Sequence, residues 1–517
     1  MTGELNQKRV LVLGLGQTGL SLARHLVAAG AVPTVADTRE QPPGLAVLRE
    51  TLPEVRCVCG PLWSALFDGI DLVAVSPGVA VSGPLADPEV SAARARGIPM
   101  IGDIELFAGA LAAEKLASGY DPKVLAITGT NGKTTVTALA AYLARAAGKR
   151  ALAAGNIGPA VLDAWAKAKA DGELPDIWVL EVSSFQLETT HSLQADAAVV
   201  LNLSEDHLDR HGDMTAYAAA KARVFAGGGV QVLNRDDPRT MAMRRPFIPK
   251  NRRDLSPVVL SFGRGEPRMA TDYGLVREEG SGGLVWLAQG GRQTGTSADS
   301  QEDVAPQRLV PQDVLGIKGE HNALNALAAL ALNRAIGLRL APMLKALPGY
   351  AGEAHRVQPV ADVAGVRYVD DSKGTNVGAT LAALHGLGQE LASGCKLLLI
   401  AGGEGKGQDF SPLAAAVAAS CRAVMLIGRA APVLRDALAP AGIDMVDCES
   451  VDAAVQCAAH RARVGDTVLL SPACASFDMF CGYAHRAEVF VAAVRALGRS
   501  HEAPVAPDFA AGGGSDV

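Results

Sequence analysis

The segment Thr128–Thr135 constrains the fold more than any other stretch of the chain. It reads TGTNGKTT, follows the apolar run VLAI and precedes residues with a helical pattern. Such a loop binds phosphate between a strand and a helix amino terminus, where glycines expose backbone N–H groups. Lys133 adds positive charge at the β- and γ-phosphates, and the Thr134 hydroxyl is a ligand for Mg²⁺. The sequence therefore predicts an α/β domain that binds a nucleoside triphosphate.

A second glycine-rich turn lies near the amino terminus. Gly14, Gly16 and Gly19 form G-x-G-x-x-G after the apolar run RVLVLG, and Asp37 closes the next apolar run. In such a turn the backbone approaches a pyrophosphate and the acid contacts a ribose. The turn fits NAD, FAD or a UDP-sugar, and it also fits glycines that serve only tight packing of a helix on a strand. The loop Ser76–Gly78 follows the strand-like LVAV, and there a plain turn and a ligand contact both remain open.

Apolar runs and helical patterns alternate along the chain and predict parallel strands joined by crossover helices. Polar segments with glycine or proline interrupt this alternation at 112–123 and 347–353, where we expect a linker and a hinge. Residues 263–310 have little apolar periodicity, and we expect a surface insertion or flexible hairpin there. The predicted fold class is α/β. The predicted domains are residues 1–115, 116–348 and 349–500, followed by a disordered tail at 501–517.

The composition indicates the cellular compartment of the protein and the kind of partner that it binds. The 517 residues have a formal net charge of -6 and no long run of Lys or Arg, so no nucleic-acid partner is expected. We see no secretory signal, and no apolar run reaches the roughly 18 residues of a membrane span. The eight cysteines form no C-x-x-C pair, so we expect small buried thiols rather than disulfides or a zinc site. We expect a monomer in the reducing cytoplasm that binds small molecules.

The phosphate loop departs from the usual P-loop, because Ile127 stands where the leading glycine is normally found. The form G-T-N-G-K-T resembles the signature of the Mur ligase family and of its folylpolyglutamate synthase relatives. These enzymes use ATP to turn a carboxylate into an acyl phosphate and then into an amide. The resemblance covers nearly the whole chain apart from the insertion and the tail. It is sharpest in GLGQTG at 14–19, DTR at 37–39, GNIG at 155–158, EVSSFQL at 181–187 and SPACAS at 471–476.

The resemblance implies a Rossmann-like amino-terminal domain, a central P-loop-type ATPase domain and a carboxyl-terminal Rossmann-like domain. It is closest to the family members that add D-glutamate to UDP-N-acetylmuramoyl-L-alanine in peptidoglycan precursor synthesis. It further implies that Thr134, Glu181, His207 and Lys221 bind Mg²⁺, with Lys221 carbamylated by CO₂ to give an anionic ligand. Carbamylation requires a neutral amine, so the pKa of Lys221 must lie well below its usual ~10.4. The third domain is expected to close at the hinge and exclude water.

The same resemblance assigns the remaining site residues. The catalytic set is Lys133, Glu181, His207 and Lys221. The ATP contacts are Gly129, Thr130, Asn131, Gly132, Lys133, Thr134, Thr135, Asn322, Asn325, Arg356 and Asp371. The UDP-sugar contacts are Gln17, Thr18, Asp37, Thr38, Arg39, Ser76, Gly78 and Asn156. The D-glutamate contacts are Lys373, Thr375, Lys406, Ser476, Phe477 and Tyr483, although for Phe477 and Tyr483 simple packing beneath a helix remains an alternative.

Three other functions fit part of the sequence. The first glycine turn alone would suit a nicotinamide-dependent dehydrogenase, but a dehydrogenase leaves the loop at 128–135 unexplained. A non-catalytic nucleotide switch would use that loop but needs no amino-acid site. Within the ligases, a sibling that adds a different amino acid is the nearest alternative.

Overall fold

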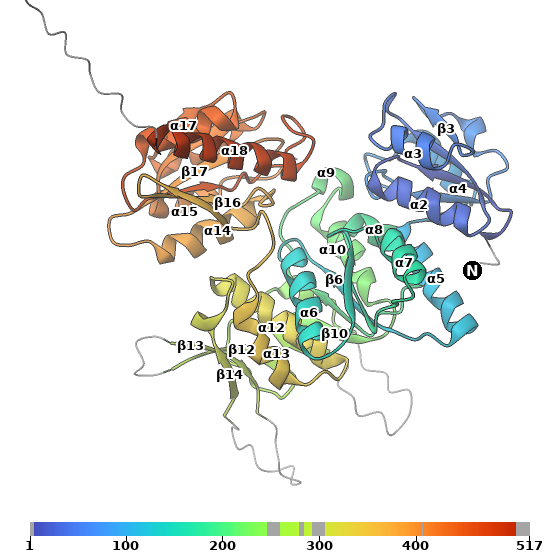
Figure 1. Cartoon of the computed structure of the whole chain (residues 1–517), viewed down its shortest axis with the longest axis horizontal. Coiled ribbons are helices and arrows are strands. Elements are labelled where there is room, and N and C mark those ends of the chain that lie inside the picture. The colour runs from blue at the N-terminus through green and yellow to red at the C-terminus, as the bar shows by residue number, and fades with distance from the viewer. Residues whose placement is uncertain (1–4, 246–258, 279–283, 292–304, 406, 503–517) are drawn as a thin grey trace, which may run out of the picture. The chain divides into compact units, whose positions relative to one another are not determined.

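The structure is a computed structural model that describes residues 5–245, 259–278, 284–291, 305–405 and 407–502 (Figure 1). The chain forms two compact units, Met1–Glu353 and Ala354–Val517, and each has its own buried core. Over the described residues, the first unit contains two separate sheets and the second contains one. Each sheet is built largely of parallel strands with helices between them, which confirms the predicted α/β class.

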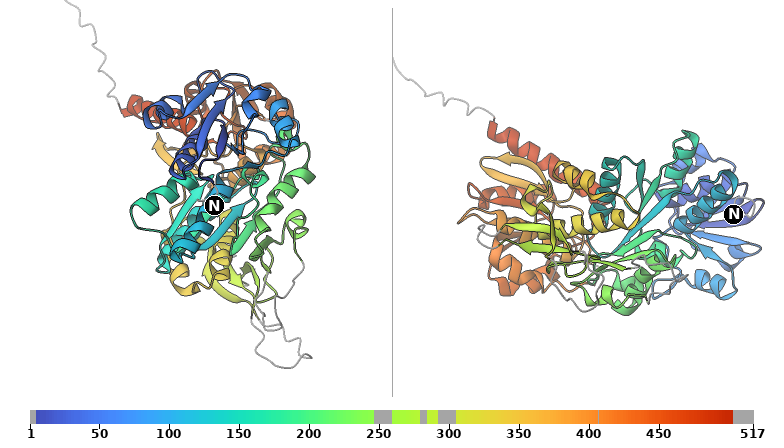
Figure 2. Two further views of the ribbon diagram at one scale, coloured as in Figure 1. Left: turned by 90° about the vertical axis from the view of Figure 1, so that its right-hand side faces the viewer. Right: turned by 90° about the horizontal axis from the view of Figure 1, so that it is seen from below.

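The amino-terminal sheet, drawn in blue in Figure 2, has the strand order β3-β2-β1-β4-β5, and its pairings are parallel. Its central strand β1 sends alternate side chains to opposite faces, because successive residues of a strand point in opposite directions. Val10 and Val12 share a core with α2, while Leu11 and Leu13 pack with Phe67 on the other face. This order matches the first five positions of the strand order 3-2-1-4-5-6 of the dinucleotide-binding fold. The elements are β1 (Arg9–Leu13), α2 (Gln17–Ala28), β2 (Val32–Asp37), α3 (Leu45–Thr51), β3 (Arg56–Cys59), η1 (Ser64–Phe67), β4 (Leu72–Val75), α4 (Pro88–Ala95), β5 (Met100–Ile101) and α5 (Asp103–Ser118).

The central sheet has the order β14-β13-β12-β11-β10-β9-β6-β8-β7, and the phosphate-loop strand β6 lies between β9 and β8. Leu125 and Ile127 of β6 pack with α6 and α12, whereas Val124 and Ala126 share a core with α5 and α7. The elements are β6 (Lys123–Thr128), α6 (Lys133–Ala146), β7 (Ala151–Gly155), α7 (Val161–Ala170), β8 (Ile177–Glu181), α8 (Ser184–Glu188), β9 (Ala197–Val200), α9 (Leu208–His211), α10 (Met214–Ala222), η2 (Arg223–Phe225), β10 (Val230–Asn234), α11 (Pro238–Met241), β11 (Val259–Phe262), β12 (Asp272–Arg277), β13 (Val285–Gln289), β14 (Gln307–Pro311), η3 (Gln312–Val314), α12 (Glu320–Ala335), α13 (Leu340–Ala346) and η4 (Leu347–Gly349).

The segment 263–310, for which the sequence predicted an insertion or hairpin, extends the central sheet where it is described. β12 continues the parallel order from β11, and β13 and β14 then pair antiparallel. Tyr273 and Leu287 are buried in the same core as α12. The physical reason is that a strand at the end of a sheet needs few apolar residues, so its pattern is weak although one face is buried. The remaining residues of the segment, 279–283 and 292–304, lie outside the described residues.

Of the two segments predicted on either side of the central domain, the first differs from a simple linker. Residues 112–118 form the exposed end of α5, which stops at Gly119 in a left-handed conformation with φ 77°. Polar residues at an exposed helix end gave this segment the composition of a linker. The first unit ends at Glu353, within the predicted hinge at 347–353. Motion at this hinge stays a prediction, and residues 503–517 of the predicted tail lie outside the described residues.

The second unit contains a sheet of order β15-β16-β20-β17-β18-β19, in which β15 is antiparallel and the other pairings are parallel. Leu397 and Leu399 of β17 pack with α14 to α16, and Leu398 and Ile400 pack with α17 and α18. The elements are β15 (Gln358–Val363), β16 (Val366–Asp370), α14 (Val377–Glu390), β17 (Leu397–Gly402), α15 (Leu413–Ser420), β18 (Cys421–Ile427), α16 (Ala431–Leu438), η5 (Ala439–Ala441), β19 (Asp444–Asp447), α17 (Val451–Arg461), β20 (Thr467–Leu470) and α18 (Tyr483–Glu502).

The cysteines correct one expectation. All eight are free thiols, but only Cys421 and Cys474 among them are buried, while Cys59 and Cys481 are exposed. The prediction of buried thiols is therefore wrong for most of them, because sparse cysteines carry no sequence pattern that reports exposure. In the described part of the chain, no helix is long and apolar enough to cross a membrane.

Candidate active site

The loop between β6 and α6 is shaped by two glycines with positive φ angles. Gly129 has φ 148°, and a Cβ there would lie 2.9 Å from Leu201 Cβ. Gly132 has φ 84°, and a Cβ there would lie 2.6 Å from the side-chain oxygen of Asn325. Any other residue would be strained at both positions and would collide with a neighbour. The glycines are therefore required for the loop, and Asn325 of α12 lies directly against it.

A second loop, which follows β9, holds the phosphate loop in place. The backbone N–H of Asn131 donates to Asn202 Oδ1 at 2.9 Å, and Asn202 Nδ2 donates back to the Asn131 carbonyl at 3.1 Å. The Thr130 N–H donates to the Asn202 carbonyl at 2.8 Å, and the Thr130 hydroxyl donates to the Ser204 carbonyl at 3.2 Å. Asn202 begins the stretch NLSEDHLD, which also contains His207, but sequence reasoning gave Asn202 no role. Its signal was its position in the same short stretch as His207.

Two lysines converge on one carbonyl oxygen of the phosphate loop. Lys133 Nζ donates to Gly129 O at 2.9 Å and to Thr130 O at 2.7 Å. Lys221 Nζ, from α10, donates to the same Gly129 O at 2.8 Å. Lys221 is 1% exposed, and its burial, followed by the charge of Lys133, lowers its pKa well below the ordinary lysine value. The fold therefore favours a neutral amine at Lys221, which is the form that reacts with CO₂.

Glu181 lies at the end of β8, at the same edge of the sheet as the phosphate loop. Strand register pairs it with Ile127 of β6 and with Gly155 of β7. Its Oε1 accepts a hydrogen bond from Asn156 Nδ2 at 2.6 Å. Its Oε2 is buried and, among the described residues, has no hydrogen-bond partner. A buried carboxylate oxygen with free lone pairs suits a cation, so the residues at this edge fit the expected Mg²⁺.

Thr134 is buried at the start of α6, at 3% exposure. The described residues contain no cluster of three His, Cys, Asp or Glu side chains that could hold a metal ion alone. Besides Glu181 and His207, a metal here would therefore need ligands of other kinds, such as the Thr134 hydroxyl, phosphate oxygens and a carbamate.

His207 lies at the amino end of α9 with φ 56°, and it is only partly exposed. Its ring packs edge-on against Phe185 with 4.7 Å between ring centroids. Its Nε2 lies 3.7 Å from a carboxylate oxygen of Asp206. The structure thus brings Phe185 of the stretch EVSSFQL into contact with His207, which is 22 residues later in the sequence.

The carboxylate of Asp37 holds together the predicted UDP-sugar loops. Asp37 Oδ2 accepts from the Leu15 N–H at 2.7 Å and from Arg39 Nη2 at 2.7 Å. Its Oδ1 accepts from the Arg39 N–H at 2.9 Å and from Arg39 Nε at 2.8 Å. Burial alone would raise the pKa of Asp37, but the hydrogen bonds from Arg39 and Leu15 outweigh it and lower that pKa. Four accepted bonds occupy the usual capacity of a carboxylate, so Asp37 orients the loop. Gln17, Thr38, Arg39 and Gly78 are exposed, and Thr18 is partly exposed.

Close packing explains the rest of the first glycine turn. A Cβ at Gly19 would lie 1.8 Å from the Gly14 carbonyl oxygen, and Gly14 itself has φ 87°. The Ser76 hydroxyl donates to that same Gly14 carbonyl at 3.0 Å. The carboxyl ends of β1 and β4 therefore meet at the Ser76–Gly78 loop.

Arg210 connects the amino-terminal and central parts of the first unit and was missed by sequence reasoning. Its Nη1 donates to Pro77 O at 3.2 Å, and its Nη2 donates to Val79 O at 3.1 Å. The same Nη2 pairs with Glu188 Oε2 at 2.9 Å. Arg210 is 5% exposed, and its guanidinium also lies 4.4 Å from the Phe185 ring centroid. No local pattern indicates that an arginine in the helix α9 is buried.

In the second unit, Asp371 lies at the carboxyl end of β16. Its Oδ2 accepts from the Ser471 hydroxyl at 2.7 Å, and its Oδ1 accepts from the Val357 N–H at 3.3 Å. Burial raises the pKa of Asp371 to about 7, although Ser471 and the nearby charge of Arg356 act in the opposite direction. Arg356 and Asp371, which the sequence assigned to ATP, are therefore neighbours within this unit.

The predicted amino-acid pocket is brought together in part. Lys373 Nζ lies 5.2 Å from the centroid of the Tyr483 ring, a cation–π contact. Ser476 is buried, while Phe477 is 72% exposed, so packing beneath a helix is wrong for Phe477. Thr375 is partly exposed, and Lys406 lies outside the described residues.

Arg486 is a further residue that sequence reasoning missed. It is fully buried, and it donates to the carbonyls of Ser372 and Cys474 at 2.9 and 3.2 Å. Arg486 thereby ties the loop after β16 to the loop after β20, and both loops contain predicted pocket residues.

Comparison with known proteins gives the family. Three family descriptions match the chain: Mur ligase MurD-like, N-terminal domain over residues 8–102, Mur ligase middle domain over 127–333, and Mur ligase, glutamate ligase domain over 355–474. A protein of Burkholderia mallei (strain SAVP1), named UDP-N-acetylmuramoylalanine--D-glutamate ligase, is 53% identical over 510 residues, which cover 96% of this chain and 98% of that protein. The chain belongs to the Mur ligase family. A relative with the same name in Burkholderia pseudomallei (strain K96243) has the same identity and coverage. Mur ligases depend on ATP and generally use Mg²⁺.

Solved structures of other Mur ligases share the fold. UDP-N-acetylmuramate-alanine ligase from Thermotoga maritima has a TM-score of 0.57 at 19% identity, covering 94% of this chain and 99% of that one. The MurF ligase of the same organism, solved with ADP, has a TM-score of 0.55 at 15% identity, covering 97% of each chain. These likenesses confirm the predicted fold of a Mur ligase. None of the matches supports the nicotinamide-dependent dehydrogenase.

Proposed function

We propose that this Mur ligase joins D-glutamate to the L-alanyl carboxylate of UDP-N-acetylmuramoyl-L-alanine at the expense of ATP. The convergence of Lys133 and Lys221 on Gly129 O, beside the buried Glu181, is the observation that supports phosphoryl transfer. The names of the relatives that are 53% identical support the choice of D-glutamate. We place the step in the cytoplasm, where ATP and nucleotide sugars are available, as part of peptidoglycan precursor synthesis.

ATP is proposed to bind with its phosphates in the loop from Gly129 to Thr135. Backbone N–H groups at the start of α6 would face the phosphate oxygens, and Lys133 would exchange its bonds to the loop carbonyls for bonds to the phosphates. Asn322 and Asn325 of α12 are the proposed contacts on the adenine side, and Asn325 already lies against Gly132. Thr134, Glu181, His207 and carbamylated Lys221 would hold Mg²⁺. Bound there, Mg²⁺ would neutralise part of the negative charge of the triphosphate.

Lys221 is proposed to carry a carbamate. Its neutral Nζ would attack CO₂, form the N–C bond and release one proton to solvent. The product is an anion in the place of a neutral amine. It would be attracted by the positive charge of Lys133, which, after burial, disfavours a protonated Lys221. Equilibration with ¹³CO₂ followed by ¹³C NMR tests this step. A carbamate resonance that is absent from Lys221→Arg supports it, and its absence from the unmodified protein contradicts it.

The acceptor is proposed to lie along the carboxyl ends of β1 and β4. Gln17, Thr18, Thr38 and Arg39 would contact the uridine, with Asp37 acting through the hydrogen bonds that orient Arg39. Ser76, Gly78 and Asn156 would contact the phosphates and the muramoyl group. Because Asn156 donates to Glu181, one side chain joins the acceptor site to the phosphate-transfer site.

The reaction then has two chemical steps. An oxygen of the alanyl carboxylate attacks the γ-phosphorus, the bond to the β-phosphate breaks, and ADP leaves. Lys133 would stabilise the charge that develops on the transferred group. The D-glutamate amine attacks the acyl carbon, the carbon–oxygen bond to phosphate breaks, and a proton is lost from nitrogen. Lys373, Thr375, Lys406, Ser476, Phe477 and Tyr483 are the proposed contacts for D-glutamate, and Arg356 and Asp371 for ATP.

The decisive experiment measures phosphate release from ATP with Mg²⁺ and UDP-N-acetylmuramoyl-L-alanine across a panel of amino acids. D-glutamate alone should stimulate release, and mass spectrometry should find the amide product. Stimulation by another amino acid would indicate the sibling ligase. Hydrolysis of ATP that no amino acid changes would indicate a nucleotide switch. No consumption of ATP with every substrate present would overturn the proposal.

A further inference from the structure

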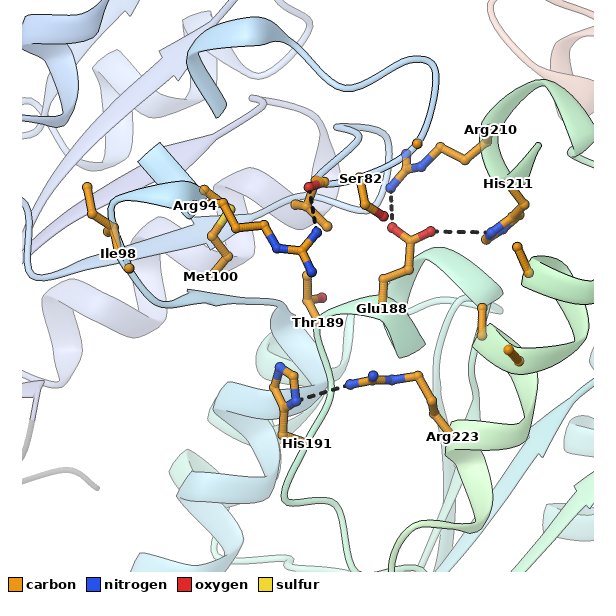
Figure 3. A pocket seen from close by; sticks show the side chains of 16 residues that line it. Ser82, Arg94, Ile98, Met100, Glu188, Thr189, His191, Arg210, His211 and Arg223 are labelled. Atoms are coloured by element: carbon orange, nitrogen blue, oxygen red, sulfur yellow. Dashed lines mark hydrogen bonds and ion pairs between the residues drawn. The ribbon is translucent and has the colours of Figure 1, made fainter. Parts of the chain in front are cut away.

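A cavity of about 690 Å³ lies within the first unit and is lined by none of the proposed substrate contacts (Figure 3). One wall comes from the amino-terminal residues Val81–Gly83, from the helix α4 and from the segment that follows α4. The other wall comes from α8, α10 and the segments that flank them. None of its lining residues belongs to the predicted ATP, UDP-sugar or metal sets. A volume of this size is in the range of small-molecule pockets.

The lining is rich in positive charge. Among the described lining residues, Arg94, Arg210 and Arg223 stand against a single carboxylate, that of Glu188. Both oxygens of Glu188 are already engaged, since Oε2 pairs with Arg210 at 2.9 Å and Oε1 lies 3.4 Å from His211 Nδ1. The charges of Arg94 and Arg223 are therefore not compensated by the one acid in the cavity.

Arg94 and Arg223 use only part of their hydrogen-bonding capacity. Arg94 Nη1 donates to Val81 O at 3.1 Å. Arg223 donates to Leu187 O at 2.6 Å and to Thr190 O at 2.7 Å. Within the described part of the chain, neither guanidinium forms an ion pair with a carboxylate. Figure 3 shows both side chains directed toward the cavity, one from each wall.

One more donor is available at the cavity. His191 Nδ1 lies 3.0 Å from Arg223 Nη2 and must accept that bond, because a guanidinium only donates. The proton of neutral His191 is then on Nε2, which makes His191 a further donor. Unused donors with uncompensated positive charge match the requirements of a tetrahedral oxyanion.

Much of the rest of the wall is apolar. Ile98 and Met100 are partly buried, and Ala216 and Ala219 of α10 are small exposed side chains. We propose that this cavity binds a phosphate group, either as free phosphate or as a phosphomonoester with a short apolar substituent. Arg94 and Arg223 would contact the phosphate oxygens from opposite walls. The proposal is independent of the proposed ligase function, because binding can be measured without turnover.

The test is calorimetric titration of the full chain with inorganic phosphate and, separately, with n-butyl phosphate. The P-loop is first saturated with Mg²⁺ and a non-hydrolysable ATP analogue, so that phosphate binding there is blocked. We expect one site per chain, and a loss of about 10-fold or more in affinity in Arg94→Gln and in Arg223→Gln, since each removes a charge-assisted contact. Tighter binding of the butyl ester would identify a phosphomonoester as the ligand, and equal affinities would identify free phosphate.

Arg96→Gln is the matched control. Arg96 directly follows α4, pairs with Asp68 at 3.3 Å and does not line the cavity, so its variant should bind as the unmodified protein does. Arg223→Gln removes two bonds to backbone carbonyls and could disturb folding, but Arg94 is exposed and its variant avoids that risk. Failure of both probes to bind at about 10 mM, well above the range of small-molecule sites, would overturn the proposal. Unchanged affinity in Arg94→Gln would overturn it as well.

Discussion

Replacing Arg210 with glutamine tests whether one buried side chain joins the acceptor loop to the central domain. The change removes the donors to Pro77 O and Val79 O and the ion pair with Glu188. Glu188 would gain little from His211, because burial lowers the pKa of His211 and leaves it neutral near pH 7.5. A buried carboxylate that loses its partner costs about 3 to 5 kcal/mol. Since Glu188 is not fully buried, we expect a loss near the lower end, about 3 kcal/mol.

The assay is urea unfolding followed by tryptophan fluorescence, which reports on the central domain through the buried Trp165 and Trp178. Glu188→Gln alone should be destabilising, but the double variant should lose less than the sum of the two single variants. The difference, about 2 kcal/mol, measures the coupling of the pair. The KM for the UDP-linked acceptor should also rise about 10-fold in Arg210→Gln, because the Ser76–Gly78 loop loses its support. The reasoning is refuted if the losses in the free energy of unfolding of the two single variants add up to that of the double variant within about 0.5 kcal/mol. An unchanged KM in Arg210→Gln would refute it as well.

Three further predictions concern single residues. Burial raises the pKa of Asp103 to about 6 from 3.8, against a hydrogen bond from Gln186. Protonated Asp103 therefore contributes about 3 kcal/mol to the free energy of unfolding below pH ~4. This contribution is lost as the pH rises through 6. Melting curves from pH 4 to 7 should show this slope in the unmodified protein and not in Asp103→Asn. Lys133→Ala should reduce turnover about 100-fold or more while UDP-acceptor affinity, measured by calorimetry, stays within about twofold. Glu181→Gln should raise the Mg²⁺ concentration for half-maximal activity by about 10-fold, because a neutral amide binds the cation weakly.

Each of these predictions has a control. Asp163→Asn, on the half-exposed side of α7, should leave the pH slope unchanged, and a slope that survives in Asp103→Asn contradicts the assignment. Loss of acceptor affinity in a folded Lys133→Ala would contradict the separation of the phosphate and acceptor sites. An unchanged Mg²⁺ requirement in Glu181→Gln would remove Glu181 from the metal site.

Much of the fold could be predicted because its strong signals are local. The buried strands RVLVL, KVLAIT and LLLIAG read as continuous apolar runs, and each lies in the interior of its sheet. Strands at the edges of the sheets are harder to predict from the sequence. Gln358–Val363 and Asp444–Asp447 are at opposite edges of one sheet and are largely solvent-exposed or half-buried, so their sequences carry little apolar pattern. β12 and β13 belong to the core, but a short strand covered on one face gives a weak signal.

The sequence by itself determined the phosphate loop, because a glycine-rich turn between a strand and a helix can be recognised from adjacent residues. It also indicated which strand ends carry polar side chains. Only the tertiary structure decided that Lys221 and Lys133 both donate to Gly129 O and that the Asn131 N–H donates to Asn202. The same holds for the hydrogen bond from Arg210 of the central part to Pro77 O of the amino-terminal part. The physical reason is that burial and long-range hydrogen bonds depend on how the sheets and helices pack. A charged residue that will be buried looks the same in sequence as one that stays in water.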